Sequence, residues 1–271
     1  MQYETLDVRI EDRIAWVTLN RPEALNAMNR ALVDDLRAFF GELPSRPEWR
    51  VVVLRGAGRA FCAGLDLKEP GGDPADRGNL GLRGPSGGLR AQRHISQLPI
   101  LMRRAPQPII ACVHGAACGG GFALALASDV RIAGASARMN AAFIRIGLSA
   151  CDIGVSYLLP RLVGHSLASE LMLTGRFIDA EHALATGLVS KLVPDDRLEA
   201  EARALAEEML ATSPLGLRLT KECLGYSLDA GSLEEVIAME DRNQILCSQS
   251  PDMSEGVKAF LEKRKPVYRE L

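Results

Sequence analysis

The sequence predicts an α/β fold over residues 1–195, followed by an all-helical region over residues 196–271. Short apolar strands alternate with helices in the first region, which is the pattern of an α/β domain. In the second region every apolar repeat has helical spacing. The chain has 271 residues, of which 47% are hydrophobic, so it is long enough to bury a substantial core.

Two glycine-rich turns are the most informative motifs. Residues 60–67 read AFCAGLDL and residues 114–121 read HGAACGGG. Each turn follows a short, continuous apolar strand, predicted over residues 51–54 and 109–113, and such strands are typical of a sheet covered on both faces. Two turns of this kind can direct backbone N–H groups at one oxygen, and paired amides stabilise the oxyanion that develops in acyl-group chemistry. The sequence therefore predicts a site built from backbone groups.

The other elements of the first half follow from local patterns. Alternating apolar residues predict a β-hairpin over residues 6–19. Apolar residues at helical spacing predict a helix that starts near Asn29 and ends before Pro44. Between the two glycine turns, residues 70–88 contain many glycines and few large apolar side chains. This composition predicts a mobile loop beside the site.

The second half alternates short helices and strands before it becomes wholly helical. Residues 122–127 are apolar on every face, which predicts a buried helix that begins at the glycine triplet. The partial positive charge at the start of this helix would then strengthen the attraction of the site's amides for an anion. Further elements are expected as helices over 166–173 and 180–186 and a strand over 188–193. The helical region is expected to contain helices over 198–210, 214–224, 233–246 and 254–263.

Composition excludes several classes of partner. The formal net charge is −2, so the chain has no general attraction for nucleic acid or for an anionic membrane. We expect no membrane span, because no apolar run approaches the roughly 20 residues that cross a bilayer. We expect no signal peptide, because residues 1–4 lack its basic and apolar regions. The six cysteines show no Cys-x-x-Cys spacing. We therefore expect reduced thiols, no metal site and a cytoplasmic location.

Three further motifs follow the glycine turns: residues 173–176 (LTGR), 183–189 (ALATGLV) and 260–264 (FLEKR). The whole set resembles the enoyl-CoA hydratase/isomerase (crotonase) superfamily over nearly the full chain. The resemblance implies a crotonase-like spiral of ββα repeats over residues 1–195 and a C-terminal helical region over 196–271 that forms trimers, often paired into hexamers. It also implies an acyl-CoA thioester substrate, with coenzyme A as part of the substrate and no other cofactor.

The resemblance also implies site residues. The backbone amides of Leu65 and Gly120 would form an oxyanion hole around the thioester oxygen, which becomes enolate-like during the reaction. By the same resemblance, four residues would contact the CoA moiety within one subunit: Ala24, Ala63, Asp66 and Leu67. Phe260 and Lys263, in the C-terminal tail of a neighbouring subunit, would also reach this CoA moiety.

The chain departs from the family pattern at two positions. Members that hydrate enoyl-CoA carry two glutamates that share a water molecule, and the matching residues here are Ala123 and Phe143. Neither side chain can carry a proton, so the usual hydratase mechanism is not expected. Asp152 stands where dienoyl-CoA isomerases carry a proton-shuttling aspartate, and the nucleophilic aspartate of 4-chlorobenzoyl-CoA dehalogenases falls at a similar place. Asp152 is therefore the candidate acid/base.

Both aspartates also have a structural interpretation. Asp152 could cap a helix that starts at Ile153, and Asp66 could cap a helix with Glu69 three positions later. His94, on the helix that leads toward the site, is a candidate substrate contact. Three functions stay open: hydratase/isomerase-type chemistry through Asp152, dienoyl-CoA isomerase-like or aryl-CoA dehalogenase-like chemistry through Asp152, and acyl-CoA binding without catalysis.

Overall fold

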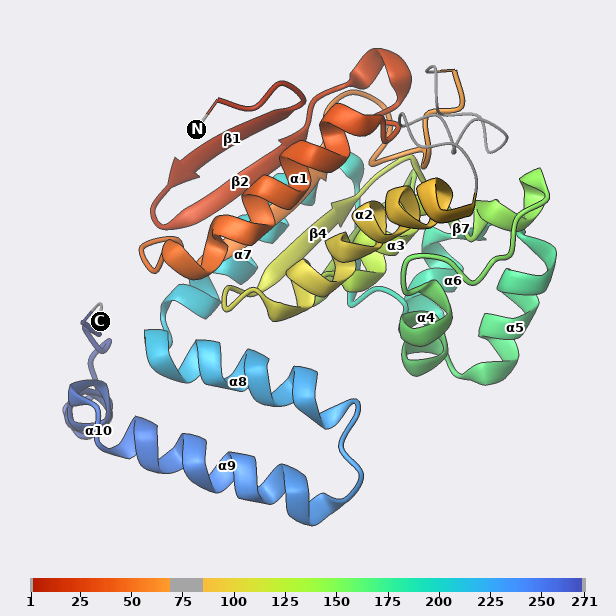
Figure 1. Ribbon diagram of the computed structural model, residues 1–271. Helices are drawn as coiled ribbons and strands as arrows, with labels where there is room; N and C mark the ends of the chain where they lie inside the picture. The colour runs from red at the N-terminus through yellow and green to blue at the C-terminus, as the bar shows by residue number, and fades with distance from the viewer. Residues whose placement is uncertain (1, 69–84, 270–271) are drawn as a thin grey trace.

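The computed structural model describes residues 2–68 and 85–269, and a large sheet lies at its centre (Figure 1). Six strands form this sheet in the order β1-β2-β3-β4-β6-β9, and β5, β7 and β8 form a smaller one. The large sheet contains β1 (Leu6–Glu11), β2 (Ile14–Leu19), β3 (Val51–Gly56), β4 (Ile109–Val113), β6 (Val130–Gly134) and β9 (Lys191–Val193). The small sheet contains β5 (Ala116–Cys118), β7 (Arg138–Asn140) and β8 (Ile178–Asp179).

The predicted hairpin and buried strands are confirmed. β1 and β2 pair antiparallel, with Leu6 opposite Leu19, and β2 through β9 pair in parallel across the rest of the large sheet. All residues of β2 and β4 are buried, as a strand covered on both faces requires. The predicted strand over 188–193 is shorter than expected, because only its last three residues pair with β6.

Helices cover both faces of the large sheet. On one face lie α1 (Arg30–Glu42), α2 (Pro85–Arg104) and α3 (Gly120–Ala127), and on the other lies α7 (Leu198–Leu210). The predicted helix after Asn29 is confirmed as α1, since the Asn29 side chain accepts a hydrogen bond from the N–H of Leu32 and caps the helix. Helix α3 is buried at every residue, as the apolar run predicted.

One predicted loop is partly helical. Residues 85–88 were expected to end a mobile loop, but they form the first turn of α2. The physical reason is that Pro85 stands at the first helical position, where its fixed φ is favourable and its missing N–H costs nothing. The rest of that expected loop, residues 70–84, lies outside the described residues.

A unit of two strands repeats along the chain. β4 leads to β5 and α3, and β6 leads to β7 and the 3-10 helix η4 (Ala142–Ile146). In each unit the first strand joins the large sheet and the second joins the small one. The start of α3 therefore lies where the chain has passed from one sheet to the other. The helices that follow are α4 (Val155–Val163), α5 (His165–Thr174) and α6 (Ala180–Ala185).

The last three helices form an arm. It consists of α8 (Pro214–Ser227), α9 (Leu233–Ser248) and α10 (Pro251–Leu261). Figure 1 shows α8 and α9 side by side below the sheet, with α10 at the end of the arm close to the C-terminus. Large apolar side chains of the arm are exposed, among them Leu224, Leu233, Ile245, Phe260 and Leu261. Of the helices described, none is long and apolar enough to span a lipid bilayer.

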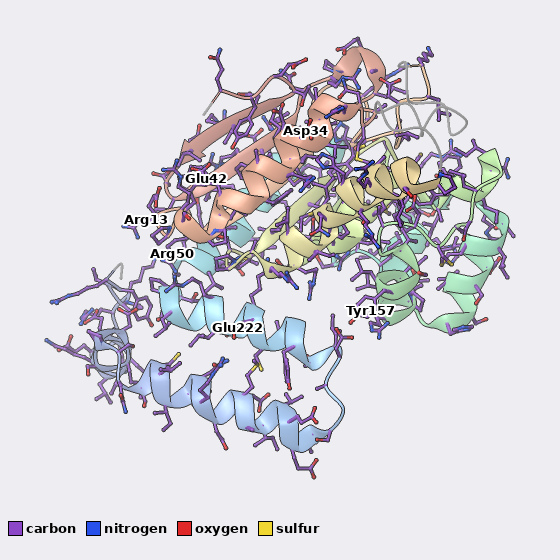
Figure 2. The ribbon with its side chains drawn as sticks, viewed as in Figure 1. Arg13, Asp34, Glu42, Arg50, Tyr157 and Glu222 are labelled. Atoms are coloured by element: carbon purple, nitrogen blue, oxygen red, sulfur yellow. The ribbon has the colours of Figure 1, made fainter. Side chains whose placement is uncertain are left out.

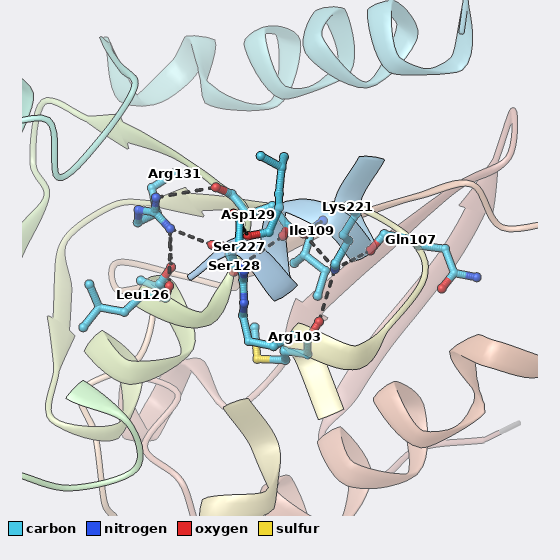
Figure 3. A network of polar contacts seen from close by, with 12 residues as sticks. Arg103, Gln107, Ile109, Leu126, Ser128, Asp129, Arg131, Lys221 and Ser227 are labelled. Atoms are coloured by element: carbon cyan, nitrogen blue, oxygen red, sulfur yellow. Dashed lines mark hydrogen bonds and ion pairs between the residues drawn. The ribbon is translucent and has the colours of Figure 1, made fainter. Parts of the chain in front are cut away.

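A buried ion pair joins the arm to the core (Figure 3). Lys221 of α8 places its Nζ 2.8 Å from Oδ2 of Asp129, which lies between α3 and β6, and the two side chains are 5% and 20% exposed. The same Nζ donates to the carbonyls of Met102 and Gln107. Burial lowers the pKa of Lys221, while the charge of Asp129 opposes this shift. One cation thus links the arm to the end of α2, to the start of β4 and to the end of α3.

The C-terminal end of α3 is held by a second buried cation. Arg131 of β6 donates to the carbonyl of Ser128 at 2.6 Å (Figure 3). It also donates to the carbonyl of Leu188 at 2.8 Å. The last carbonyls of a helix have no partners within the helix, and a cation there also interacts favourably with the helix dipole. Arg131 therefore fixes α3 at the end opposite Gly120.

Candidate functional site

The two glycine turns pack against each other. The N–H of Cys118 donates to the Cys62 carbonyl at 2.9 Å. Gly64 has a φ of 97°, and a Cβ at this position would stand 2.8 Å from the carbonyl oxygen of Cys118 and 3.7 Å from the nitrogen of Gly120. Glycine is required at position 64 both for this conformation and for the close approach. The turn that carries Leu65 therefore lies against the start of α3.

The amides of Leu65 and Gly120 stand on these adjoining turns. Gly120 is the first residue of α3, where a helix leaves N–H groups without an internal partner. Leu65 lies between two bonds to Met28: the Gly64 carbonyl accepts from the Met28 N–H at 2.6 Å, and the Asp66 N–H donates to the Met28 carbonyl at 3.1 Å. Within residues 2–68 and 85–269, neither amide donates to a backbone carbonyl. Two N–H groups bind one oxygen where both are directed at it.

The first CoA-contacting candidates are brought together. Ala24 ends the 3-10 helix η1 (Pro22–Ala24), and the N–H of Ala63 donates to the carbonyl of Leu25, the next residue after Ala24, at 3.0 Å. Leu67, at the end of the same turn, is 47% exposed. Segments that lie about forty residues apart in the sequence thus form one surface beside the Leu65 amide.

Asn26 supports this surface and was missed by the sequence reasoning. It is fully buried, has a φ of 55°, and donates through Nδ2 to the carbonyls of Ala57 and Ala60 at 2.9 and 2.8 Å. Asparagine adopts the left-handed region more readily than most residues, which is the only signal that the sequence offers. Its side chain holds the segment around Ala24 against the turn that leads to Leu65.

Asp66 makes structural contacts. Its Oδ2 lies 2.9 Å from Nη2 of Arg21, and the two side chains are 11% and 17% exposed. Its Oδ1 accepts a hydrogen bond from the N–H of Lys68 at 3.1 Å, which is the local bond of an Asx turn. Glu69, the partner expected for a capping box, lies outside the described residues. Both oxygens of Asp66 are therefore engaged by the chain itself.

Asp152 is brought to the second glycine turn by its neighbour Ile153. The Cδ1 atom of Ile153 lies 3.4 Å from the place that a Cβ on Gly120 would take. Ile153 also has a φ of 34°, which is an outlier for a β-branched residue. Such a conformation persists only where the surroundings hold it. Asp152 therefore directly precedes a residue that is fixed against the start of α3.

The structure does not support Asp152 as a helix cap. The N-cap residue of α4 is Gly154, with a φ of 87°, and no side chain caps this helix. The Asp152 carboxylate instead accepts hydrogen bonds at Oδ1 from the N–H of Ile153, at 2.8 Å, and from Nε2 of Gln92 on α2. Gln92 was not singled out from the sequence, which gives no signal for it.

Apolar residues occupy positions 123 and 143, where the resemblance places the two glutamates. Ala123 is 1% exposed inside α3. The Phe143 ring approaches within 3.5 Å of the place that a Cβ on Gly119 would take. An aromatic ring, and not a carboxylate, therefore borders the second glycine turn on this side.

His94 is directed toward α1. Its Nε2 lies 2.5 Å from Oδ1 of Asp34, its Nδ1 contacts Arg37, and Figure 2 labels Asp34 on α1. Residues two apart on a helix do not face the same way, so His94 and Gln92 point in different directions from α2. The structure thus does not bring His94 to Asp152.

The cysteines near the site are weak nucleophiles or lie at its surface. Burial raises the pKa of the Cys62 thiol to about 12 and that of Cys118 to about 11. Both thiols therefore stay protonated near neutral pH, and only the thiolate is reactive. Cys151, next to Asp152, is exposed.

The tail residues lie away from the glycine turns of their own chain. Phe260 is 82% exposed near the end of α10, and Lys263 follows it with a φ of 52°. Figure 1 shows α10 at the far end of the arm from α3. A single chain therefore does not unite these two residues with Leu65 and Gly120.

A groove of about 980 Å³ lies between α2, α4 and α8. Figure 2 shows Tyr157 on α4 and Glu222 on α8, and both residues line the groove together with Ile153. The Tyr157 hydroxyl donates to Asp229 across it. Ile153 therefore borders both the groove and the start of α3.

Comparisons of the sequence with known proteins all indicate the same protein family. The model of the enoyl-CoA hydratase/isomerase family matches residues 9–270. "Probable enoyl-CoA hydratase EchA12" of Mycobacterium tuberculosis is 42% identical over 256 residues, covering 94% of this chain and 89% of that protein. The 1,2-epoxyphenylacetyl-CoA isomerase of Escherichia coli is 35% identical over 259 residues, covering 96% of each.

Solved structures share the fold. An enoyl-CoA hydratase from Bacillus anthracis matches with a TM-score of 0.90 at 32% identity, over 99% of this chain and 100% of that one. The predicted fold class, a crotonase-like α/β spiral followed by helices, is confirmed by this match.

Proposed function

Because this chain belongs to the enoyl-CoA hydratase/isomerase family and is an enzyme of the hydratase/isomerase kind, we propose that it moves a proton on a bound acyl-CoA thioester. Asp152 carries the proton, and the amides of Leu65 and Gly120 bind the thioester oxygen. The observation that supports this most directly is the contact of Ile153 with the Gly120 position, which joins the segment of Asp152 to the paired amides.

The chemistry follows from these groups. When a C–H bond next to the thioester carbonyl breaks, its electron pair is delocalised onto the thioester oxygen, and two N–H donors stabilise that charge. The dipole of α3 adds to this effect. Asp152 accepts the proton and returns it to another carbon of the same substrate, so that a double bond moves and no atom is lost. No cofactor is required beyond the coenzyme A of the substrate.

The residues around the second turn favour isomerisation over hydration. Hydration by the usual route needs two carboxylates to hold a water molecule, and Ala123 and Phe143 supply none. The preference rests on these two residues, because the relatives are named for both kinds of reaction. Dienoyl-CoA isomerase-like chemistry is one form of the proposal, and an aryl-CoA dehalogenase-like reaction, with Asp152 as nucleophile, is the alternative.

We further propose that the arm assembles the chain into a homotrimer, or into a hexamer of two trimers. The exposed apolar side chains of α8, α9 and α10 support this, because amphipathic helices must bury their apolar stripes. In such an assembly Phe260 and Lys263 would complete the CoA site of a neighbouring subunit, next to Ala24, Ala63 and Leu67.

A panel of thioesters tests the reaction type. Crotonyl-CoA, 3-hexenoyl-CoA, 3,5-octadienoyl-CoA and 4-chlorobenzoyl-CoA are each incubated with the protein, and binding is measured in parallel by calorimetry. We expect isomerisation of the 3-enoyl or dienoyl thioester and no hydration of crotonyl-CoA. Efficient hydration of crotonyl-CoA would contradict the proposal, and binding of every thioester without turnover would favour a non-catalytic acyl-CoA-binding protein.

Two substitutions at Gly120 test the amide. Proline removes the N–H and is tolerated at the first position of a helix, whereas alanine keeps the N–H. Both add a Cβ, which would stand 1.8 Å from Cε of Met28, so the displacement of this flexible side chain is common to both variants. We expect kcat of Gly120→Pro to be about a hundred- to a thousand-fold below that of Gly120→Ala. Equal kcat values would show that the Gly120 amide is not used.

A further inference from the structure

We infer that Gln92 is a positioning residue for Asp152: its amide holds Oδ1 of the carboxylate, so that Oδ2 is the oxygen that accepts and returns the proton. The inference rests on the proposed role of Asp152 and adds to it a specific oxygen and a second residue. It is drawn from the contacts of one side chain on α2 with one loop residue before α4.

The two oxygens of Asp152 have different surroundings. Oδ1 accepts hydrogen bonds from Nε2 of Gln92 and from the N–H of Ile153. No described residue donates to Oδ2. A carboxylate oxygen that already accepts two hydrogen bonds has less capacity to accept a proton than one that accepts none. The arrangement therefore assigns one oxygen to anchoring and leaves the other for chemistry.

Both donors are fixed in place. Gln92 lies inside α2, which packs against α1 and α3 and buries Leu98 and Met102. The N–H of Ile153 belongs to a residue with an unusual φ of 34°, whose side chain contacts the Gly120 position. Rotation of the carboxylate is therefore restricted from the side-chain end by α2 and from the backbone end by its own loop.

The Asp152 side chain binds Gln92 and does not cap helix α4. An aspartate just before a helix normally accepts from the first N–H groups of that helix, yet α4 has no side-chain cap. Asp152 is instead turned toward α2, beside a strained residue. Strain of this kind is concentrated at functional sites, which supports a role in the reaction over a role in stability.

Gln92→Met tests the inference, because methionine has a similar length and no N–H donor. Gln97→Met is the matched control: Gln97 lies on the same helix and makes no hydrogen bond to Asp152 among the described residues. With the thioester that the unaltered protein isomerises in the panel above, we expect kcat of Gln92→Met to fall about ten- to a hundred-fold with KM unchanged, because small misplacements of a reacting group have effects of this size. Gln97→Met should keep the original kcat.

Gln92→Glu separates the donor from the bulk of the side chain. It keeps the size of glutamine but replaces the N–H donor with an oxygen, so we expect the same loss of kcat at neutral pH. Unaltered kcat in both Gln92 variants, with Asp152→Asn inactive, would overturn the inference and leave the proposed function intact. A loss of folded protein that accounts for the whole loss of activity would also overturn it. An active Asp152→Asn, or an unaltered protein with no turnover, would instead remove the proposed function and this inference with it.

Discussion

Asp152→Asn should reduce isomerisation of the preferred thioester by up to about ten-thousand-fold, the upper range for loss of a general acid–base group. Asparagine has the same shape, and its oxygen can still accept from Gln92 and from the N–H of Ile153, so the loop should keep its conformation. It carries an amide nitrogen in place of Oδ2, and this nitrogen cannot accept the proton. The amides of Leu65 and Gly120 are unchanged, so the dissociation constant of the thioester should stay nearly the same.

The measurement combines steady-state kinetics with calorimetric binding on the same preparation. Cys151→Ser is the matched control, because this exposed neighbour changes the same loop without removing a proton carrier. We expect Cys151→Ser to keep the original kcat. Full activity in Asp152→Asn would disprove the role of Asp152, and a parallel loss of thioester binding would show that the substitution disturbs the site as a whole.

Asp129→Ala should lower the free energy of unfolding by about 3–5 kcal/mol, the usual cost of removing one partner of a buried ion pair. The reason is that Lys221, whose side chain is 5% exposed, would lose the carboxylate that stabilises its buried ammonium group. Arg103, which Asp129 also binds at 3.2 Å, would lose its partner as well. Urea unfolding followed by circular dichroism, at one fixed protein concentration, measures the change.

A double-mutant cycle separates the pair from its surroundings. Lys221→Met alone should cost less than Asp129→Ala, because Asp129 keeps Arg103, and the double variant should lose less than the sum of the single losses. Glu170→Ala is the control at an ion pair with Arg176, where both side chains are about half exposed, and it should cost at most about 1 kcal/mol. A loss in Asp129→Ala no larger than this control would contradict the anchoring role of the pair.

Local patterns were sufficient for much of the fold. The alternation over residues 6–19 and the apolar runs before each glycine turn depend only on which residues face the core, and the hairpin, β3 and β4 formed as predicted. The apolar segment over 122–127 became the buried helix α3 for the same reason. The predicted helices of the last region also formed as α7, α8, α9 and α10, because their apolar spacing is a property of the segment itself.

Packing between distant segments was not predicted in the same way. Helix α7 has the same amphipathic pattern as helices α8 to α10, which form the arm. Unlike them, it packs on Trp16 and Val53, on the face of the large sheet opposite to α1, α2 and α3. The pattern specifies that an apolar stripe must be buried, but not against which surface. Pro85 likewise started α2 within a segment whose glycines predicted a loop.

The sequence by itself determined the two glycine turns and the absence of glutamates at positions 123 and 143. It also made Asp152 the candidate acid/base. Each of these is a property of residue type and local order. Only the tertiary structure decided that Gly64 meets the start of α3, that Asn26 supports the turn before Leu65, and that Gln92 holds Asp152. These contacts join residues that are far apart in the sequence, and they depend on how helices and turns pack, which no local periodicity encodes.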